Sequence, residues 1–250
     1  MADVIDYKIY GDDFQAVEIE LDRGEGVRAE VGAMLYMEEG IQMDTGTGGG
    51  VFKGISRMFT GESFFITSFK NIAYGKQKVV FSAPYPGRII PIDLGSVGGE
   101  FICQKDAFLC SAHGVEISVA FTKRLGIGFF GGEGFILQRL TGDGLVFIHA
   151  GGTIIKRELG YNETLRVDTG CLVAFEKSVT YDIKLVGGIK NTLFGGEGLF
   201  LTTIKGPGTV YLQSLPFSRI ADRIMSASRT GNKGESRNVL SGVLSGILND

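Results

Sequence analysis

The chain has 250 residues, 44% of them hydrophobic, and a formal net charge of −3 at pH 7. A chain of this length and apolar content can bury a hydrophobic core without disulfides or metals. The acidic balance argues against a global positive field that would attract nucleic acid or anionic membranes. The acidic start lacks the apolar stretch of a signal peptide, and no apolar run approaches the ~18 residues of a membrane span, so we expect a cytoplasmic protein.

Glycine is the unusual part of the composition. The chain has 39 glycines, well above the usual ~7% of residues. Many short strands joined by tight turns use glycine in this way, because glycine takes positive φ without steric cost. The three cysteines are an odd set with no Cys-x-x-Cys spacing, which argues against a disulfide framework or a zinc site. The composition therefore favours an all-β protein with small cysteines in its core.

In chain order, the first element expected is a β-hairpin over residues 7–21, with a Gly-Asp-Asp turn at 11–13. A small residue followed by an apolar run then occurs three times, at Ala33, Ala107 and Cys171. Each precedes a glycine-glutamate motif by a similar distance. The first distance is 29 residues and the other two are 26. The surplus falls at the glycine-rich residues 46–50, which is typical of a loop insertion at a turn.

The glycine-glutamate motif itself occurs at Glu62, Glu133 and Glu197, which are 71 and 64 residues apart. Three apolar residues follow each motif, then two polar residues and another apolar one. Successive side chains of a strand point to opposite faces, so three consecutive apolar residues must be covered on both sides, by a second sheet or a neighbouring subunit. Turn signals end each unit, at 74–76, 141–144 and 205–208. We predict three tandem antiparallel β-sandwich modules of about 7–87, 88–152 and 153–215, packed around an approximate three-fold axis.

Residues 216–250 break this pattern and predict a basic, amphipathic helical tail. Apolar residues recur at helical spacing from Phe217. Between residues 216 and 237, the five basic residues outnumber the two acidic ones. In a helix over residues 239–248, the aliphatic side chains would lie on one stripe. Such a helix is too short to cross a membrane. The tail is either a solvated segment or an attachment to a protein partner or membrane surface, by apolar insertion plus charge. The attachment hypothesis uses Arg219, Arg223, Arg229, Val239, Leu240, Val243 and Leu244.

Patterns that carry chemistry are weak in this chain. Gly126, Gly128 and Gly131 match the dinucleotide-binding pattern, but that site needs the loop to open a helix and here it opens a strand. Cys110 and His113 supply two ligands where a closed zinc site needs four. A Cys-His nucleophile pair remains possible, because catalytic partners are not recognised by sequence position. We predict a non-enzymatic protein with no catalytic residues, no cofactor and no metal ligands.

Two interpretations of the repeated glutamates stay open. In the first, Glu62, Glu133 and Glu197 converge near the pseudo-three-fold axis and hold a cation or a polar ligand. In the second, each accepts hydrogen bonds from turn amides, or keeps the adjacent apolar strand from pairing with other chains. Replacing all three by glutamine, while folding and metal content are measured, separates the two interpretations.

With these motifs in view, the chain resembles a known family. The three glycine-glutamate modules, Gly-Ala-Met-Leu-Tyr-Met at 32–37 and Phe-Gly-Gly-Glu-Gly-Leu at 194–199 are similar to a prokaryotic domain family of unknown function. That family is related to the fungal protein altered inheritance of mitochondria number twenty-four. The resemblance covers about residues 7–216. It implies tandem β-sandwiches like the tryptophan RNA-binding attenuation protein, assembled as a trimer.

The resemblance also bears on function. The fungal relative is tied to inner-membrane organisation, a structural role, and the family implies no catalytic residues. RNA binding by the namesake of the fold is not implied, because this chain is acidic and lacks a basic stripe with stacking aromatics. We therefore expect an oligomeric scaffold or binding module, a trimer by preference, with no nucleic-acid partner. The alternative is a small-ligand or metal-binding protein that uses the glycine-glutamate turns.

Overall fold

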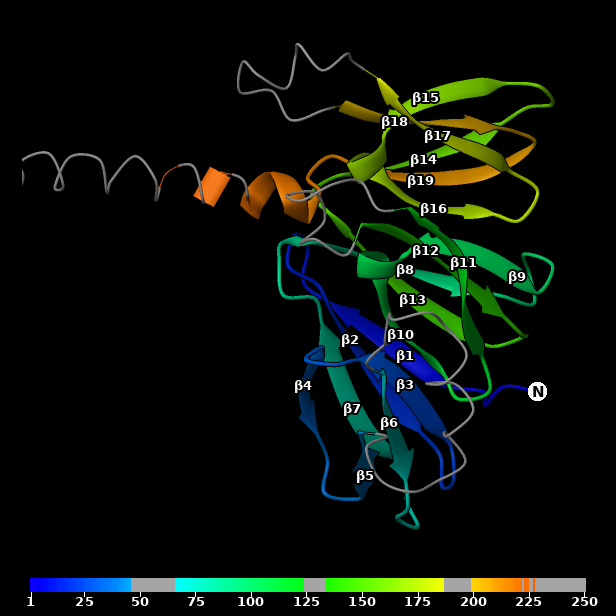
Figure 1. The fold of residues 1–250 in the computed structure, drawn as a ribbon. Helices are drawn as coiled ribbons and strands as arrows, with labels where there is room; N and C mark the ends of the chain where they lie inside the picture. Colours follow the sequence, from blue (N-terminus) through cyan, green and yellow to red (C-terminus); the bar gives the residue numbers. More distant parts are fainter. Residues whose placement is uncertain (46–65, 124–133, 187–198, 222, 225–226, 228–250) are drawn as a thin grey trace, which may run out of the picture.

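The structure, a computed structural model, describes residues 1–45, 66–123, 134–186, 199–221, 223–224 and 227. These residues form an almost entirely β protein, whose named strands pair antiparallel throughout (Figure 1). The predicted all-β class is confirmed. We divide the strands into three modules along the chain.

The first module contains the N-terminal strands, which are β1 (Asp6–Tyr10), β2 (Ala16–Leu21), β3 (Gly26–Glu30), β4 (Met34–Met37), β5 (Ile41–Asp44), β6 (Ile66–Asn71) and β7 (Gln77–Ser82). The second contains β8 (Gly87–Asp93), β9 (Glu100–Gln104), β10 (Phe108–Ala112), β11 (Glu116–Lys123), β12 (Phe135–Thr141) and β13 (Leu145–Gly151). The third contains β14 (Ile154–Leu159), β15 (Thr164–Asp168), β16 (Leu172–Glu176), β17 (Thr180–Val186), β18 (Leu199–Lys205) and β19 (Gly208–Gln213). Single 3-10 turns, η2 (Lys105–Ala107) and η4 (Thr169–Cys171), precede β10 and β16.

Four sheets connect these strands. Sheet A has the order β1-β2-β7-β4, and sheet D has the order β15-β18-β17. Sheet B, β5-β6-β3-β10-β13-β8, joins the first module to the second through β3 and β10. Sheet C, β11-β12-β9-β16-β19-β14, joins the second to the third through β9 and β16. The shared sheets place the modules in a row (Figure 1), so the arrangement around a three-fold axis that the sequence predicted is not shown.

Sheet C lies between two hydrophobic cores, which explains its apolar strands. Phe101 and Cys103 of β9 belong to the core of the first two modules, whereas Ile102 between them belongs to the core of the third. This alternation follows from the pleat of a strand, whose successive side chains point to opposite faces. On β12, Phe135, Ile136 and Leu137 are all buried. For this strand the predicted cover on both sides is confirmed.

Tight turns separate the strands where the sequence predicted them. The opening hairpin pairs β1 with β2 across residues 11–15. Gly11 has a φ of +82°, and a Cβ there would lie 2.6 Å from the Phe14 carbonyl oxygen, so this turn needs glycine. Residues 142–144 connect β12 to β13, and residues 206–207 connect β18 to β19. These short connections keep each hairpin in register.

The β body ends at Pro216, and the chain then becomes helical at 217–221, 223–224 and 227. This agrees with the helix predicted from the spacing of apolar residues after Phe217. The first helical turns stand beside the junction of the second and third modules (Figure 1). No helical segment in the described ranges is both long and apolar enough to cross a membrane.

Candidate functional site

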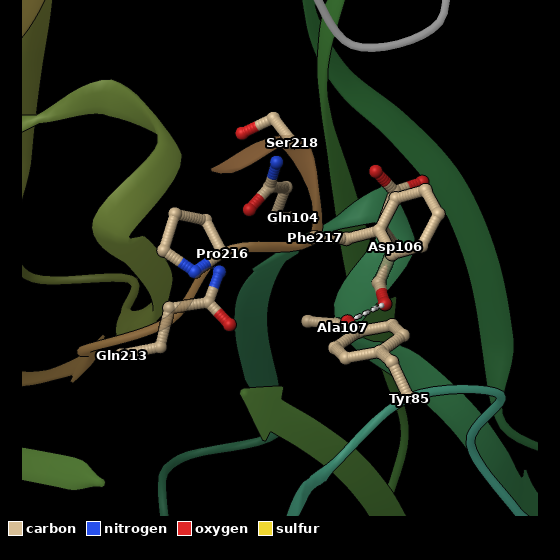
Figure 2. Close-up of a pocket in the computed structure, with 8 residues that line it drawn as sticks. All are labelled: Tyr85, Gln104, Asp106, Ala107, Gln213, Pro216, Phe217 and Ser218. Atoms are coloured by element: carbon tan, nitrogen blue, oxygen red, sulfur yellow. Dashed lines mark hydrogen bonds between the residues drawn. The ribbon is translucent and has the colours of Figure 1, made fainter. Parts of the chain in front are cut away.

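The main candidate site is a hollow at the base of the C-terminal helix, here called the helix base (Figure 2). Its lining comes from both the second and the third module and from the helix itself. The lining residues are Tyr85, Gln104, Asp106, Ala107, Gln213, Pro216, Phe217 and Ser218. The hollow has a volume of about 10 Å³, which leaves room for about one water molecule. A hollow of this size is too small for a metabolite and marks a place where the surrounding elements pack together.

Gln213, at the end of β19, ties the two modules together at this point. Its side-chain oxygen accepts a hydrogen bond from the Gly151 amide at 2.8 Å, and its side-chain nitrogen donates to the Gly170 carbonyl at 2.9 Å. Gly151 must lack a side chain, because a Cβ there would collide with the Leu215 carbonyl oxygen. A buried amide with both ends paired holds its neighbours in fixed positions.

Tyr85 holds the helix against the second module (Figure 2). Its hydroxyl donates to the Asp106 carbonyl at 3.3 Å. Its ring packs edge-on against His149 with centroids 4.6 Å apart. Its centroid is 5.4 Å from that of the Phe217 ring, which lies tilted to it. Burial raises the pKa of the Tyr85 hydroxyl well above its ordinary value, so it stays protonated. Tyr85 therefore contributes ring packing and a donated hydrogen bond, and it does not act as a base.

Arg219 ties the helix to the third module. Its guanidinium lies 2.8 Å from one carboxylate oxygen of Asp168, whose other oxygen accepts from the Gly170 amide at 3.0 Å. This contact raises the pKa of Arg219 further, chiefly through the hydrogen bond that the guanidinium donates to Asp168. The sequence offered no signal for this pair, since the partners are 51 residues apart. Arg219, predicted as an attachment residue, thus contacts the body itself.

The other predicted attachment residues extend beyond the helix base. Arg223 is exposed, and so is its neighbour Ile224. Arg229, Val239, Leu240, Val243 and Leu244 lie outside the described residues. Attachment through the tail therefore stays a prediction. The contacts of the helix base fix the place on the β body at which the tail begins.

The three glutamates of the predicted ligand site, Glu62, Glu133 and Glu197, also lie outside the described residues. Whether they converge or only stabilise turns stays open. Within the described ranges, no group of three or more His, Cys, Asp or Glu residues could hold a metal ion.

The cysteines and histidines suggested by the sequence lie mostly in the core. Cys103 and Cys110 are fully buried, and burial raises the pKa of both thiols, so they remain protonated. His113 is half-exposed, and its Nδ1 lies 3.9 Å from a carboxylate oxygen of Asp3. His149 is buried, and desolvation lowers its pKa to about 4. A buried protonated thiol is a poor nucleophile, which weakens the Cys-His interpretation.

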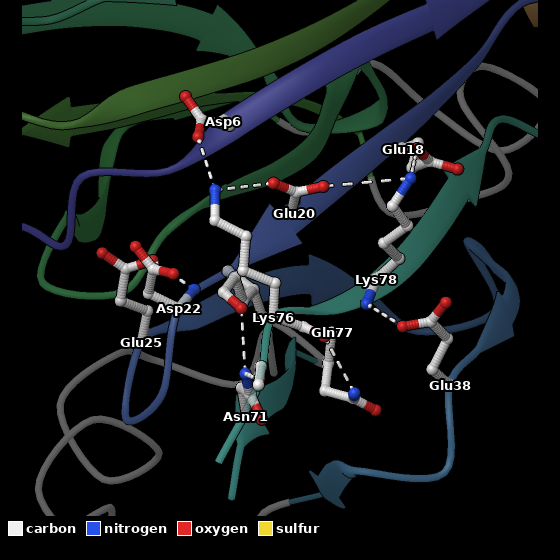
Figure 3. A network of polar contacts seen from close by, with 12 residues as sticks. Asp6, Glu18, Glu20, Asp22, Glu25, Glu38, Asn71, Lys76, Gln77 and Lys78 are labelled. Atoms are coloured by element: carbon white, nitrogen blue, oxygen red, sulfur yellow. Dashed lines mark hydrogen bonds and ion pairs between the residues drawn. The ribbon is translucent and has the colours of Figure 1, made fainter. Parts of the chain in front are cut away.

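A polar network on the first module was missed by the sequence reasoning (Figure 3). Glu18 of β2 is buried, and its carboxylate accepts from Lys78 at 2.8 Å, Tyr36 at 3.3 Å and Tyr10 at 3.4 Å. The hydrogen bond from Lys78 is the main cause that lowers the pKa of Glu18. One signal was present in the sequence, since acidic residues alternate at Glu18 and Glu20 and basic ones at Lys76 and Lys78.

This network joins four strands into one surface. Glu18 and Glu20 lie on β2, with Lys76 just before β7 and Lys78 on it. Lys76 bonds Glu20 at 2.7 Å and Asp6 of β1 at 3.4 Å (Figure 3). Tyr36 brings in β4. The network orders the outer face of sheet A beside the β4 edge.

Comparisons with known proteins now add the family. Residues 7–215 match the family model described as "Mitochondrial biogenesis AIM24". An uncharacterised protein of Streptococcus pyogenes serotype M6 is 31% identical over 216 residues, which cover 83% of this chain and 84% of the relative. A crystal structure of another S. pyogenes protein, SPYM3_0169, superposes with a TM-score of 0.73 at 28% identity. It covers 89% of this chain and 99% of that one.

The comparisons cover nearly the whole β body, and the names of both streptococcal proteins state no activity. The resemblance read from the glycine-glutamate motifs is confirmed. The chain belongs to the family described as mitochondrial biogenesis AIM24, in its prokaryotic form.

Proposed function

We propose that this protein is a non-enzymatic oligomeric scaffold or binding module in the cytoplasm, and that its C-terminal tail attaches the β body to a partner. One observation carries the proposal, which is that the base of the tail is held by two modules at once. Phe217 packs on Tyr85, whose hydroxyl donates to Asp106 of the second module, and Arg219 pairs with Asp168 of the third module. A partner bound to the tail is thereby placed at a defined position relative to the body.

The chemistry of the described residues supports a binding role. The buried thiols are held protonated, and His149 is held neutral at pH 7. The helix base is too small for a substrate. Beyond it, the exposed Arg223 and Ile224 combine a positive charge with an apolar side chain. This combination suits a membrane surface or an amphipathic groove on a partner protein.

The test compares the full chain with a chain that ends at Leu215. Co-sedimentation with vesicles containing anionic lipids measures membrane binding, and affinity capture measures protein partners. We expect the full chain to bind in at least one assay and the shortened chain to bind in neither. Equal binding by both chains would contradict the attachment role.

A matched variant tests the helix base itself. The double change Phe217→Ala and Arg219→Ala keeps the tail but removes its contacts with Tyr85 and Asp168. We expect binding to persist while the partner loses its fixed position on the body. Cross-linking between the bound partner and the body should then fall. Unchanged cross-linking would show that the helix base does not position the partner.

A further inference from the structure

We infer that copies of this chain join head to tail, with β15 of one copy paired antiparallel to β4 of the next. This strand contact would hold together the oligomer of the proposed function, and to that extent the inference rests on the proposed function. The contact does not involve the C-terminal tail. It follows from the strands that join the modules within one chain. With β1 left aside, each module has six named strands in the same order, β2–β7, β8–β13 and β14–β19. In each junction the second of these six strands, β3 or β9, pairs with the third strand of the next module, β10 or β16. The second strand of the last module, β15, and the third strand of the first, β4, are left over.

The two internal junctions have the same register. Between β3 and β10, the partners run from Ala29 opposite Cys110 to Val27 opposite Ala112. Between β9 and β16, they run from Cys103 opposite Ala174 to Phe101 opposite Glu176. Each junction is a three-residue antiparallel pairing. One joining rule is therefore used twice in the chain.

A shared irregularity aligns β4 with β10 and β16. Each strand skips one residue in its pairing with the neighbour on its other side. The skipped residues are Leu35 between β4 and β7, Leu109 between β10 and β13, and Val173 between β16 and β19. A bulge at the same place in three strands marks equivalent positions. Tyr36 is therefore the counterpart of Cys110 and Ala174.

The pairing of β15 with β18 aligns it with β3 and β9. In this pairing Val167 lies opposite Thr202. The corresponding pairs place Ala29 opposite Thr67 and Cys103 opposite Gln138. Val167 is therefore the counterpart of Ala29 and Cys103. The joining rule then places Val167 opposite Tyr36, Arg166 opposite Met37, and Leu165 opposite Glu38.

Among the described residues, β4 is not covered in the way that its counterparts β10 and β16 are. Every residue of β10 is buried, and four of the five in β16 are buried. On β4, Met34, Leu35, Tyr36 and Met37 are 37%, 60%, 47% and 36% exposed. Exposed edge strands are usually protected by lysine, proline or a covering segment. Met-Leu-Tyr-Met carries neither residue, and among the described residues β4 has a strand on one side only.

The matching edge on β15 is also open within the described part of the chain, where only β18 pairs with it. Its outward residues, Thr164 and Arg166, are exposed. In one chain β4 and β15 lie at opposite ends of the row, with the second module between them (Figure 1). The partner for each is therefore a second copy. Such a contact between different surfaces closes into a ring when the rotation permits and otherwise extends as a filament.

Thiol cross-linking tests the register. All chains carry Cys171→Ala, since alanine stands at the equivalent positions 33 and 107, while Cys103 and Cys110 are buried. Copies with Met37→Cys are mixed with copies carrying Arg166→Cys and treated with a short bis-maleimide. We expect a covalent dimer. The matched control replaces Arg166→Cys by Ile155→Cys, an exposed residue of β14 on a different edge of the same module. Equal dimer from both mixtures, or none from the first, overturns the inference.

A charge variant tests the same contact without cross-linking. Met37→Lys places a lysine opposite Arg166, and like charges directly opposite each other destabilise strand pairing. Sedimentation velocity should show association weakened by up to about fivefold. The thermal transition, measured at a protein concentration that keeps the chain monomeric, should be unchanged because both side chains are exposed. Combining Met37→Lys with Arg166→Glu should restore association. Unchanged association in the single variant, or no recovery in the double variant, overturns the inference.

The same measurements on the chain that ends at Leu215 separate this inference from the attachment role. Association that persists without the tail and remains sensitive to Met37→Lys supports the strand contact, even where partner binding by the tail fails. Association that vanishes with the tail and ignores Met37→Lys overturns the strand contact and leaves the scaffold proposal standing.

Discussion

The strands β10 and β4 hold the same place in their modules and differ in almost everything else. β10 lies within sheet B, between β3 and β13, and all its residues are buried. β4 lies at the edge of sheet A, and all its residues are exposed. At the bulge, Leu109 is 2% exposed and Leu35 is 60% exposed. The same side chain is thus core or surface according to whether a module precedes it in the row. An apolar strand sequence reports that a cover is needed, and the position in the row decides whether the chain supplies it.

The same contrast holds for polar groups. The middle module buries His149 without a hydrogen-bond partner for Nδ1 among the described residues. The first module keeps its charges in a network on the outer face of sheet A, where Glu18 has three donors. The middle of the row is therefore organised by packing, and the first module adds surface pairs.

The largest expected effect compares the two leucines directly. Leu109→Ala leaves a cavity in the core and is expected to lower the free energy of unfolding by about 2–5 kcal/mol. Leu35→Ala removes an exposed side chain and is expected to change it by no more than about 0.5 kcal/mol. Urea unfolding at a protein concentration that keeps the chain monomeric measures both. Equal costs at the two positions would mean that β4 is covered in the monomer.

The second prediction concerns acid stability of the middle module. The folded pKa of His149, about 4, lies below its ordinary 6.5, so the unfolded chain binds a proton more readily. Stability is therefore fully present above pH 6.5 and falls as the pH drops toward 4, by about 3 kcal/mol for this group. Positions 149 and 213 are equivalent, because Phe147 and Tyr211 pair with the equivalent residues Cys110 and Ala174. His149→Gln therefore introduces the residue found at position 213, and it should flatten this slope whatever its effect at pH 7. The check is the urea midpoint measured across pH 7 to 4.

A control for this prediction uses His113, which is half-exposed. His113→Gln should leave most of the slope between pH 6.5 and 4 in place. If His113→Gln flattens the slope and His149→Gln does not, the burial of His149 is not the source of the acid sensitivity.

Much of the local fold could be predicted from the sequence, because it depends on short-range pattern. Alternation and a Gly-Asp-Asp turn predicted the β1–β2 hairpin, and consecutive apolar residues predicted the two-sided burial of Phe135 to Leu137. The row of modules could not be predicted in this way. It depends on β3 pairing with β10 and β9 with β16, and no periodicity within a strand specifies its partner in another module.

The candidate site shows the same limit. The spacing of apolar residues after Phe217 predicted a helix, but its base depends on Gln213, Tyr85 and the Arg219–Asp168 pair. These residues come from distant parts of the chain and meet only when the modules are joined. The acidic and basic alternation at Glu18, Glu20, Lys76 and Lys78 was visible in the sequence. It became a network only through the register of β2 and β7.

The smallest expected effect comes from that network and tests whether surface charges matter in the first module as packing does in the second. The hydrogen bond from Lys78 is the main cause that lowers the pKa of Glu18 in the folded protein. The stability that this carboxylate contributes is therefore present above its ordinary pKa of 4.5 and is lost as the pH falls through the folded pKa. Glu18→Gln should lower the free energy of unfolding by at most about 1 kcal/mol at pH 7, because solvent reaches the partners and screens the charge pair. The difference from the natural chain should vanish at acid pH, where Glu18 is protonated. Glu20→Gln, at a more exposed position, is the control and should cost less. A cost of Glu18→Gln that stays constant from pH 7 to 3 would assign the role of Glu18 to packing and remove the electrostatic half of the contrast between the modules.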